Sequence, residues 1–409
     1  MGTARERLVI VGTCSTGVGA AVGGSGQTAR RIFRGLRDLG HEIHTIGIGA
    51  SPSFLEDFGI TYHSCDQVEY DGLWPHPNHV FPLAEKVAQV AIEHRADVLH
   101  AHYLFPWGWA VWEAQRLIEF ATGRRVSVVQ RPAGTDVTLH GAHFPLLLRT
   151  LLAQADANII NTRAFAEEVA RISTLGDHLR YEQIYNPIPD AFERGAPALR
   201  EVFGISPAQV VVGVVGNFRR VKGAPYAIEI FNRFLRSSGL DAVLLMIGNG
   251  ADANKCRASA AELGILDRVL WVGRLDRMAP AYSSLDILLH PSTYESFGLV
   301  LGEAARCRVP CVASNVGGIP EVVEDGETGF LCPSNDLDAF VVRLTELARD
   351  RALRERMGQA AEERTKRLFN LSAIAAAYEG VFLRVVRAAA QNHSGSSPAR
   401  SRFYSYLRG

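Results

Sequence analysis

Residues 210–216 read VVVGVVG, and they are followed by a polar loop over 217–223 and by a helical pattern over Ala224–Ser237. A short apolar run that leads through a loop into an amphipathic segment is typical of a β–α unit in a parallel sheet. Further apolar runs alternate with helical patterns, at 242–248, 269–273, 286–292 and 310–314. The second half of the chain is therefore predicted to form a doubly wound α/β domain over 210–390.

The first half of the chain shows the same alternation. Its apolar runs lie at 8–13, 42–48, 97–103, 126–130, 157–161 and 182–186. They predict a first Rossmann-like domain over 1–188, and the Pro- and Gly-containing segment 189–209 is the predicted interdomain linker. The polar residues 391–409 are expected to form a flexible tail. We therefore predict two doubly wound parallel-sheet domains that face a central cleft, with ligands at the carboxyl ends of the strands.

The composition excludes several classes of protein. With 409 residues, 47% of them hydrophobic and 21% charged, the chain is long enough for two or three folded domains and is not disordered. Equal numbers of basic and acidic side chains, 43 of each, give no basic surface for a nucleic acid. No apolar stretch reaches the roughly 18–20 residues of a membrane span, so no stable membrane anchor is expected.

Cysteines and arginines bear on where the chain works. The six cysteines are scattered without a CxxC pair, which favours reduced thiols over a disulfide framework or a zinc site, and hence a cytoplasmic location. The helical pattern over Thr28–Arg37 carries four arginines. Such a helix can lie on a membrane surface, but a solvated basic face is the preferred interpretation. A homodimer is left open.

The strongest candidate site is Glu295-Ser-Phe-Gly-Leu-Val-Leu-Gly-Glu303, which follows an apolar run and opens a helix at Gly298. The unpaired N–H groups and the partial positive charge of a helix N-terminus suit a diphosphate. Glu295, in the loop ahead of the helix, can bind sugar hydroxyls, and Glu303 lies two turns into the helix. The structural alternative is an ordinary helix acid and a surface glutamate.

A second candidate is the basic loop after the strand at 210–216. Arg219 and Lys222 lie three residues apart there, so both can reach one diphosphate, Arg219 as a bidentate fork and Lys222 as a point charge. A solvated basic loop is the alternative, although lysine is scarce in this chain. With the helix N-terminus at Gly298, the loop predicts a pyrophosphate clamp. No DxD-like acidic pair follows a suitable strand, so no metal is predicted.

Two glycine-containing loops carry weaker signals. Gly23-Gly24-Ser25-Gly26 allows close approach of the backbone to a phosphate or a sugar, but a structural turn explains it nearly as well. It lacks the GxGxxG spacing, and no acidic residue ends the second strand, so a nicotinamide cofactor is not expected. Val316-Gly-Gly-Ile-Pro-Glu321 predicts a loop before a helix, with Glu321 as a first-turn acid rather than a partner of the clamp.

Together these motifs resemble the retaining family 4 glycosyltransferases of the GT-B fold, and the resemblance extends from about Leu8 to Arg367. It implies an enzyme that takes a nucleotide sugar and a small polar acceptor, without a cofactor or a metal. It also implies a front-face attack, in which an oxygen of the donor phosphate takes the acceptor proton.

The resemblance assigns a role to each motif residue. Glu295 would bind hydroxyls of the donor sugar and Glu303 the nucleotide ribose. Arg219 and Lys222 would bind the diphosphate, and these two residues with Glu295 are the predicted catalytic residues. Further donor contacts would come from the first glycine loop and from backbone amides at the helix start, at Gly24, Phe297, Gly298, Leu299 and Val300.

Several stretches are similar to the branch of this family that transfers N-acetylglucosamine to malate in bacillithiol biosynthesis: GGSG, HAHYLFPWG (100–108), AGTDVTLHG (133–141) and NFRRVK. That branch carries a His before its GTD, where this chain has Ala133. The predicted acceptor-binding residues are Ser25, His102, Arg131 and Asp136, with a helix N-cap as the alternative role of Asp136.

The predicted reaction is the transfer, with retention, of a sugar from UDP-N-acetylglucosamine to a hydroxyl of a small polar acceptor. The favoured acceptor is an aminocyclitol such as 2-deoxystreptamine, as in the biosynthesis of aminoglycoside antibiotics. The alternative is malate or an inositol, in the biosynthesis of low-molecular-weight thiols. A UDP-sugar 2-epimerase and a nucleotide-sugar-binding protein without catalysis are the competing classes.

Overall fold

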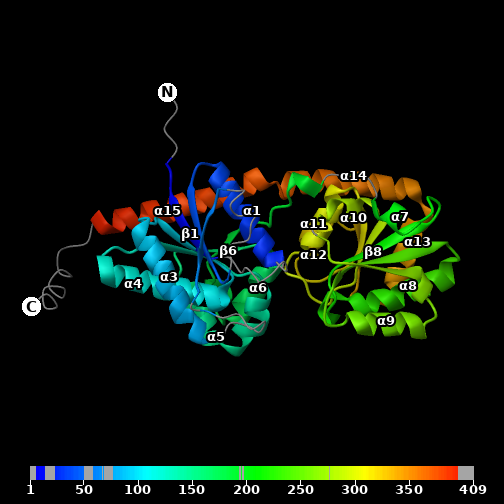
Figure 1. Cartoon of the computed structure of the whole chain (residues 1–409), viewed down its shortest axis with the longest axis horizontal. Coiled ribbons are helices and arrows are strands. Elements are labelled where there is room, and N and C mark those ends of the chain that lie inside the picture. The colour runs from blue at the N-terminus through cyan, green and yellow to red at the C-terminus, as the bar shows by residue number, and fades with distance from the viewer. Residues whose placement is uncertain are drawn as a thin grey trace, which may run out of the picture. The chain divides into compact units, whose positions relative to one another are not determined.

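The computed structural model describes residues 6–13, 24–49, 59–66, 68, 77–192, 195, 198–275 and 277–394. The chain divides into two compact units (Figure 1). Unit 1 comprises residues 1–160, 169–182 and 375–409, and unit 2 comprises residues 161–168 and 183–374.

Unit 1 is built on a seven-stranded sheet. Its strands are β1 (Val9–Thr13), β2 (Glu42–Gly47), β3 (Thr61–Ser64), β4 (Val98–His102), β5 (Ser127–Arg131), β6 (Ala157–Ile160) and β7 (Glu182–Gln183). They lie in the order β3-β2-β1-β4-β5-β6-β7, and the pairings from β3 to β6 are parallel. Val9 lies opposite Glu42 on β2, and Ile10 lies opposite Val98 on β4. The chain order therefore reverses at β1, between β2 and β4.

Helices cover both faces of this sheet. The helices that lie wholly or partly in this unit are α1 (Gly24–Asp38), α3 (Val80–Glu93), α4 (Trp109–Thr122), α5 (Pro145–Gln154), α6 (Arg163–Ile172) and α15 (Leu371–Ser394), with short helical turns at Pro77–His79, Leu104–Gly108, Asp136–Gly141 and Gly176–His178. The first residues of α6, 163–168, and of α15, 371–374, belong to unit 2. Helices α3 and α4 share a core with Val11 and Leu99, because alternate residues of β1 and β4 face them.

The opposite face of β1 and β4 packs against α1 and α15. The ring of His100 on β4 is surrounded by Phe33 of α1 and by Tyr378 and Phe382 of α15. A Cβ on Gly12 would lie 2.3 Å from Phe33 Cζ, so the glycine lets α1 approach β1 closely. The last long helix is therefore part of the core of unit 1.

Unit 2 repeats the architecture with a six-stranded, wholly parallel sheet. Its strands are β8 (Val210–Asn217), β9 (Ala242–Asn249), β10 (Val269–Gly273), β11 (Ile287–His290), β12 (Cys311–Ser314) and β13 (Gly329–Cys332). They lie in the order β10-β9-β8-β11-β12-β13. The chain order reverses at β8, which makes the ends of β8 and β11 the topological switch point of this sheet.

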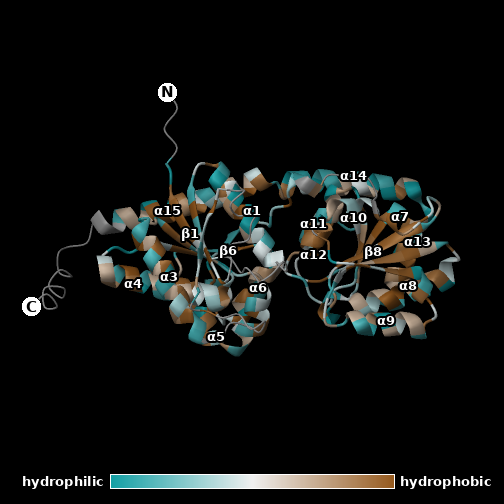
Figure 2. Cartoon of the chain, in the orientation of Figure 1, coloured by the Kyte–Doolittle hydropathy of each residue, from teal (hydrophilic) through white to brown (hydrophobic). Residues whose placement is uncertain are grey.

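Successive side chains of β8 point to opposite faces of the sheet and pack into two separate hydrophobic cores in unit 2. The helices are α7 (Ala198–Val202), α8 (Ala224–Ser238), α9 (Ala253–Glu262), α10 (Ala279–Ser283), α11 (Leu299–Arg306), α12 (Ile319–Val322), α13 (Leu337–Arg349) and α14 (Arg351–Leu368), with short turns at Asp190–Phe192, Arg220–Lys222 and Leu266–Arg268. Val212 and Val214 pack with α8, α9 and α13, whereas Val211 and Val215 pack with α10 and α11. Figure 2 shows the hydrophobic strands between the more polar helices.

The two parallel sheets confirm the predicted fold class, but the units differ from the predicted domain boundaries. Residues 189–209 are not a free connection: Leu199 and Ile205 are buried in unit 2, and Arg200 Nη2 lies 2.7 Å from Asp286 Oδ2. Residues 375–390, expected in the second domain, belong to unit 1 because α15 contributes aromatic side chains to its core. The residues 395–409 of the predicted tail lie outside the described part of the chain.

The composition also led to expectations about the cysteines and about membrane-spanning segments. Cys65, Cys256, Cys307, Cys311 and Cys332 are buried and form no disulfide with one another, as predicted, and Cys14 lies outside the described residues. Within the described residues one helical run, Arg351–Gln391, is long and apolar enough to cross a membrane, which the sequence analysis did not foresee. This run consists of α14 and α15, and the apolar side of α15 is occupied by the core of unit 1. It is therefore weak support for a membrane span.

A buried polar contact fastens α15 to the sheet of unit 1. The backbone N–H of Leu8 donates to His41 Nδ1 at 3.1 Å, so His41 Nε2 carries the proton that faces Glu379 Oε1 at 3.0 Å. Both side chains are almost completely buried. The carboxylate of Glu379 thus holds a fixed histidine tautomer at the start of β2.

Replacing Glu379 with Ala should lower the free energy of unfolding by about 1–3 kcal/mol, because a buried N–H loses its acceptor. Urea unfolding followed by circular dichroism measures the change. The matched control is Arg384→Ala. Arg384 lies on α15, like Glu379, and forms an exposed ion pair with Glu182 of β7. Loss of this pair should lower the free energy of unfolding by less than about 1 kcal/mol. Equal losses in the two variants would contradict the assigned role of Glu379.

Candidate functional site

Two loops meet at the switch point of unit 2. The N–H of Thr293, after β11, donates to the carbonyl oxygen of Val221, after β8, at 3.0 Å. Gly223 has φ +76°, and a Cβ there would lie 2.0 Å from the carbonyl oxygen of Pro291. Only glycine fits both the backbone angle and the space. This close approach places Lys222 beside the loop that carries Glu295.

The side chains of Lys222, Glu295 and His290 lie close together. Lys222 Nζ lies 2.7 Å from Glu295 Oε2, and His290 Nε2 lies 3.5 Å from the same oxygen. Burial by itself would raise the pKa of Glu295, but Lys222 and His290 outweigh burial and lower the pKa to about 2. The carboxylate is therefore ionised at neutral pH. The Lys222 side chain remains 37% exposed, so its ammonium group can also meet a ligand.

The start of α11 lies directly after this cluster. The helix begins at Leu299 with Gly298 as its N-cap, in a left-handed conformation at φ +91°. Phe297 is buried against Phe369, so it can offer a ligand only its backbone. Leu299 and Val300 are partly exposed. The backbone N–H groups predicted to bind phosphate thus lie next to Glu295 in the chain, and their contact with a phosphate stays a prediction.

The second glycine loop supports the backbone of Glu295. The N–H of Gly318 donates to the carbonyl oxygen of Glu295 at 2.9 Å, and a Cβ on Gly317 would lie 2.1 Å from that oxygen. Glu321, in the first turn of α12, accepts hydrogen bonds from the N–H of Ala164 and from Gln183 Nε2. The Val316–Glu321 motif therefore positions the site and does not add a charge to the clamp.

Arg219 and Glu303 have different environments. Arg219 is exposed and lies just before the short turn that carries Lys222, so it belongs to the same loop, but it makes no ion pair with any other described residue. Glu303 is buried on α11 and accepts a hydrogen bond from the hydroxyl of Tyr282 at 2.9 Å. Its predicted contact with a ribose stays a prediction.

His290 and Tyr282 contact the two motif glutamates but were not among the residues predicted from the sequence. His290 is the last residue of β11, at the end of an apolar run, and it was treated as part of that strand. Its position immediately ahead of the Glu295 loop is the signal that could have drawn attention to it, because a strand's carboxyl end directs side chains toward the ligand edge of the sheet.

In unit 1 the first glycine motif differs from the prediction. Gly24, Ser25 and Gly26 are not a loop but the first turn of α1, and Gly23 lies outside the described residues. The motif still stands where α1 begins, so its backbone N–H groups can face a ligand as a helix N-terminus does. The physical basis of the prediction therefore changes from loop flexibility to the helix terminus.

His102 and Arg131 are neighbours at the ends of β4 and β5. Arg131 Nη1 lies 3.2 Å from His102 Nε2, and because a guanidinium has no acceptor, His102 Nε2 must accept. Burial lowers the pKa of His102 well below its usual value, and Arg131 and His100 lower it further. His102 is therefore neutral, and both side chains are almost completely buried.

Asp136 has a structural role. Its carboxylate accepts hydrogen bonds from the backbone N–H groups of Leu104, Ala133 and Val137, at 2.8–3.1 Å. Its side chain is completely buried, and these donors are not those of an ordinary N-cap. Its predicted contact with an acceptor stays a prediction. The carboxylate joins the loops after β4 and β5, and burial raises its pKa.

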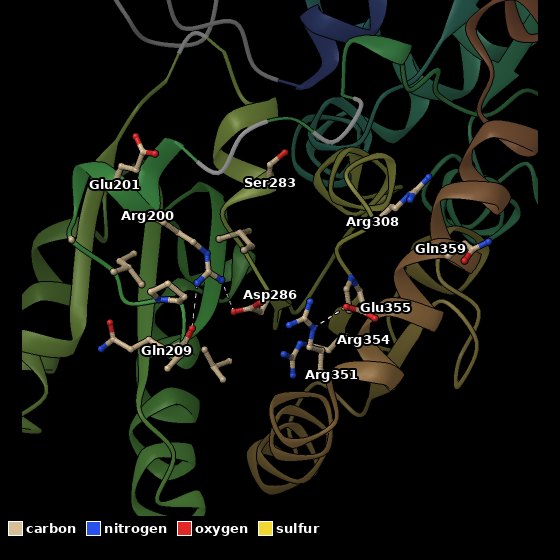
Figure 3. A pocket seen from close by; sticks show the side chains of 17 residues that line it. Arg200, Glu201, Gln209, Ser283, Asp286, Arg308, Arg351, Arg354, Glu355 and Gln359 are labelled. Atoms are coloured by element: carbon tan, nitrogen blue, oxygen red, sulfur yellow. Dashed lines mark hydrogen bonds and ion pairs between the residues drawn. The ribbon is translucent and has the colours of Figure 1, made fainter.

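A cavity of about 990 Å³ lies elsewhere in unit 2 (Figure 3). Gln209 precedes β8 and Asp286 precedes β11, so the cavity lies at the amino ends of these strands, away from Lys222 and Glu295. Its arginines are engaged with protein groups: Arg200 pairs with Asp286, and Arg351 pairs with Glu355. The cavity is therefore distinct from the predicted donor site.

Replacing Lys222 with Met should lower the free energy of unfolding at neutral pH by about 1–3 kcal/mol, because a mostly buried carboxylate loses its cation. The pKa of Glu295 is lowered from 4.5 to about 2 on folding, so its stabilisation is complete above about pH 5 and is lost as the pH falls toward 2. Urea unfolding at several pH values should show a weaker acid dependence in Lys222→Met. Lys255→Met, at an exposed position of α9, is the control, and the same acid dependence in both variants would argue against the contact.

Comparisons with known proteins agree with this geometry. Residues 196–364 match the family described as glycosyl transferases group 1, and residues 23–187 match the glycosyl transferase 4-like domain. The chain is 32% identical to an N-acetyl-alpha-D-glucosaminyl L-malate synthase from Bacillus anthracis, over 90% of this chain and 95% of the relative. It is 30% identical to a D-inositol 3-phosphate glycosyltransferase from Kribbella flavida, over 83% and 86% of the two chains.

Solved structures share the fold. A sucrose-phosphate synthase from Thermosynechococcus elongatus has a TM-score of 0.78 at 21% identity, over 93% of this chain and 100% of that chain. The Anabaena protein HepE, in complex with UDP and glucose, has a TM-score of 0.76 at 19% identity, over 92% and 100% of the two chains. Two parallel sheets, two matching family models and a relative that aligns over nearly the whole length lead to one conclusion: the chain belongs to the family 4 glycosyltransferases, sugar-transferring enzymes of the GT-B fold.

Proposed function

We propose that this enzyme transfers N-acetylglucosamine, with retention, from UDP-N-acetylglucosamine to a hydroxyl of a small acceptor that carries a carboxylate or a phosphate. The contact of Lys222 with Glu295, at the switch point of unit 2, carries the proposal. In this contact the ionised carboxylate of Glu295, which would bind sugar hydroxyls, lies next to the ammonium group of Lys222, which would bind the diphosphate. The sugar named for the Bacillus anthracis relative and the UDP bound by HepE support this choice of donor.

The donor's diphosphate would be held by positive charge from three sources. Lys222 is partly exposed, Arg219 is exposed on the same loop, and the N-terminus of α11 follows Glu295. Cations and N–H groups that are already in place stabilise the charge that develops on a leaving diphosphate. We propose that these groups suffice without a metal ion.

The transfer step can be written with all atoms balanced. The bond between the anomeric carbon and the diphosphate oxygen breaks, and the acceptor oxygen bonds to the anomeric carbon from the same face. The acceptor's proton moves to an oxygen of the departing diphosphate. Glu295 would orient the sugar through its hydroxyls, and its low pKa, which Lys222 maintains against burial, keeps it a hydrogen-bond acceptor throughout.

The acceptor is proposed to be an anion. Arg131 ends β5, and the N-terminus of α1 lies after β1, so two positive groups stand at the carboxyl ends of strands in unit 1. A carboxylate or phosphate complements such groups, whereas 2-deoxystreptamine, with two amines, would be repelled. The named relatives likewise favour malate or an inositol phosphate, so the alternative acceptor replaces the aminocyclitol.

Arg219→Ala and Lys222→Ala should each lower turnover by about 10²-fold or more, as the loss of a transition-state donor does. Release of UDP from UDP-N-acetylglucosamine measures the rate. Lys255→Ala, on the exposed surface of α9, should keep the wild-type rate. Near-normal rates in both clamp variants would overturn the proposed donor site.

A panel of acceptors tests the other half of the proposal. Purified enzyme with UDP-N-acetylglucosamine should release UDP in the presence of L-malate or D-inositol 3-phosphate, and mass spectrometry should find the product with one added N-acetylhexosamine. UDP release with 2-deoxystreptamine alone would refute an anionic acceptor. Formation of a 2-epimer without any acceptor, or tight binding without turnover, would refute glycosyl transfer.

A further inference from the structure

We propose that unit 1 contains a binding site for a divalent transition metal, Zn²⁺ in the first place, formed by His44, His63 and His94. These three residues, the histidine cluster, come from three separate elements. His44 lies on β2, His63 lies on the neighbouring edge strand β3, and His94 follows the last residue of α3. None of them belongs to the proposed donor or acceptor site.

The three imidazoles already converge. His44 Nδ1 lies 3.0 Å from His63 Nε2, and the rings of His44 and His94 are stacked with centroids 3.9 Å apart. One ring nitrogen from each residue lies within 4.8 Å of the other two. In a tetrahedral Zn²⁺ site with Zn–N bonds of about 2.0–2.1 Å, nitrogens lie about 3.3 Å apart. The stacked rings of His44 and His94 would therefore have to turn so that their lone pairs point to one ion.

Glu42 prepares His44 to act as a ligand. Its Oε1 lies 3.0 Å from His44 Nε2, so this nitrogen carries the ring proton and donates a hydrogen bond to the carboxylate. The lone pair of His44 is then on Nδ1, which faces His63. The other carboxylate oxygen of Glu42 pairs with Arg7 Nη2 at 2.7 Å. A carboxylate behind a metal-binding histidine, itself held in place, is a common arrangement around metal ions in proteins.

The ligand set selects the class of metal. Three imidazole nitrogens suit Zn²⁺, Co²⁺, Ni²⁺ or Cu²⁺ and are poor ligands for Mg²⁺ or Ca²⁺, which prefer oxygen. His44 is buried, while His63 and His94 are partly exposed, so a metal ion and a water as fourth ligand can reach the cluster from solvent.

The position of the cluster indicates what the metal would do. Glu42 is the first residue of β2, and His94 lies between α3 and β4, so the cluster stands near the amino ends of these strands. The predicted acceptor residues His102 and Arg131 end their strands. The metal would therefore not take part in transfer. It would join the edge strand β3 to β2 and to the end of α3, and so stabilise unit 1.

The test uses full-length enzyme without a histidine tag, freed of metal by dialysis against a chelator. Isothermal titration with Zn²⁺ should show one site per chain, and Co²⁺ should give the visible absorption of a tetrahedral complex. His63→Ala and His94→Gln should each weaken binding at least 10-fold, and Glu42→Gln should weaken it about 10–100-fold. Zn²⁺ should raise the unfolding temperature of wild-type enzyme more than that of His94→Gln.

His178→Ala is the matched control, because His178 is an exposed histidine of unit 1 outside the cluster, and it should bind Zn²⁺ as the wild type does. His94 lies at the end of a helix and is partly exposed, so its variant should fold, which circular dichroism checks. Absence of a stoichiometric site in the wild type, or unchanged affinity in folded His94→Gln and His63→Ala, would overturn the proposal and leave a stack of hydrogen-bonded histidines.

Discussion

The salt bridge between Lys222 and Glu295 joins two loops that are distant in sequence, and the proposed donor site depends on it. It exists because β8 and β11 are neighbours at the point where the strand order of unit 2 reverses. Gly223 and Pro291 bring the two loops into van der Waals contact, while Gly317 lies against the carbonyl group of Glu295 and Gly318 against that of Ser296. The glycines are thus required by close contacts between backbones, and their effect is to hold two charges together.

The amino-acid sequence predicts the sheets well and their edges poorly. Central strands such as β8 and β9 are continuous apolar runs because both of their faces are buried, and this pattern is visible without a structure. The edge strand β3 reads TYHS, with no apolar run, and it was missed. The role of α15 could not be foreseen either, since its place in unit 1 depends on contacts of Tyr378 and Phe382 with a histidine far away in sequence.

In the candidate site, residue types could be selected from the sequence, but the contacts between residues could not. Lys222 and Glu295 could be selected from their residue types and their positions after strands, but their mutual contact could not, because it depends on which strands are neighbours. Asp136 was selected by type as well, and the structure turns its carboxylate to three backbone N–H groups. A conspicuous acid in a motif can therefore serve to build a loop, and only its hydrogen bonds distinguish the two roles.

The strand order reverses in both sheets, but the basic side chains at the carboxyl ends of the strands differ in their exposure to solvent. In unit 2, Arg219 is exposed and Lys222 is partly exposed, so their charges are available to a ligand with at least two negative charges. In unit 1, Arg131 is almost completely buried beside a neutral histidine and an acid that burial disfavours as an anion. A buried cation has a stronger field than a solvated one, because little water screens it. In the proposed function, Arg131 would therefore act on an acceptor through its field, whereas the diphosphate would contact the exposed cations of unit 2 directly.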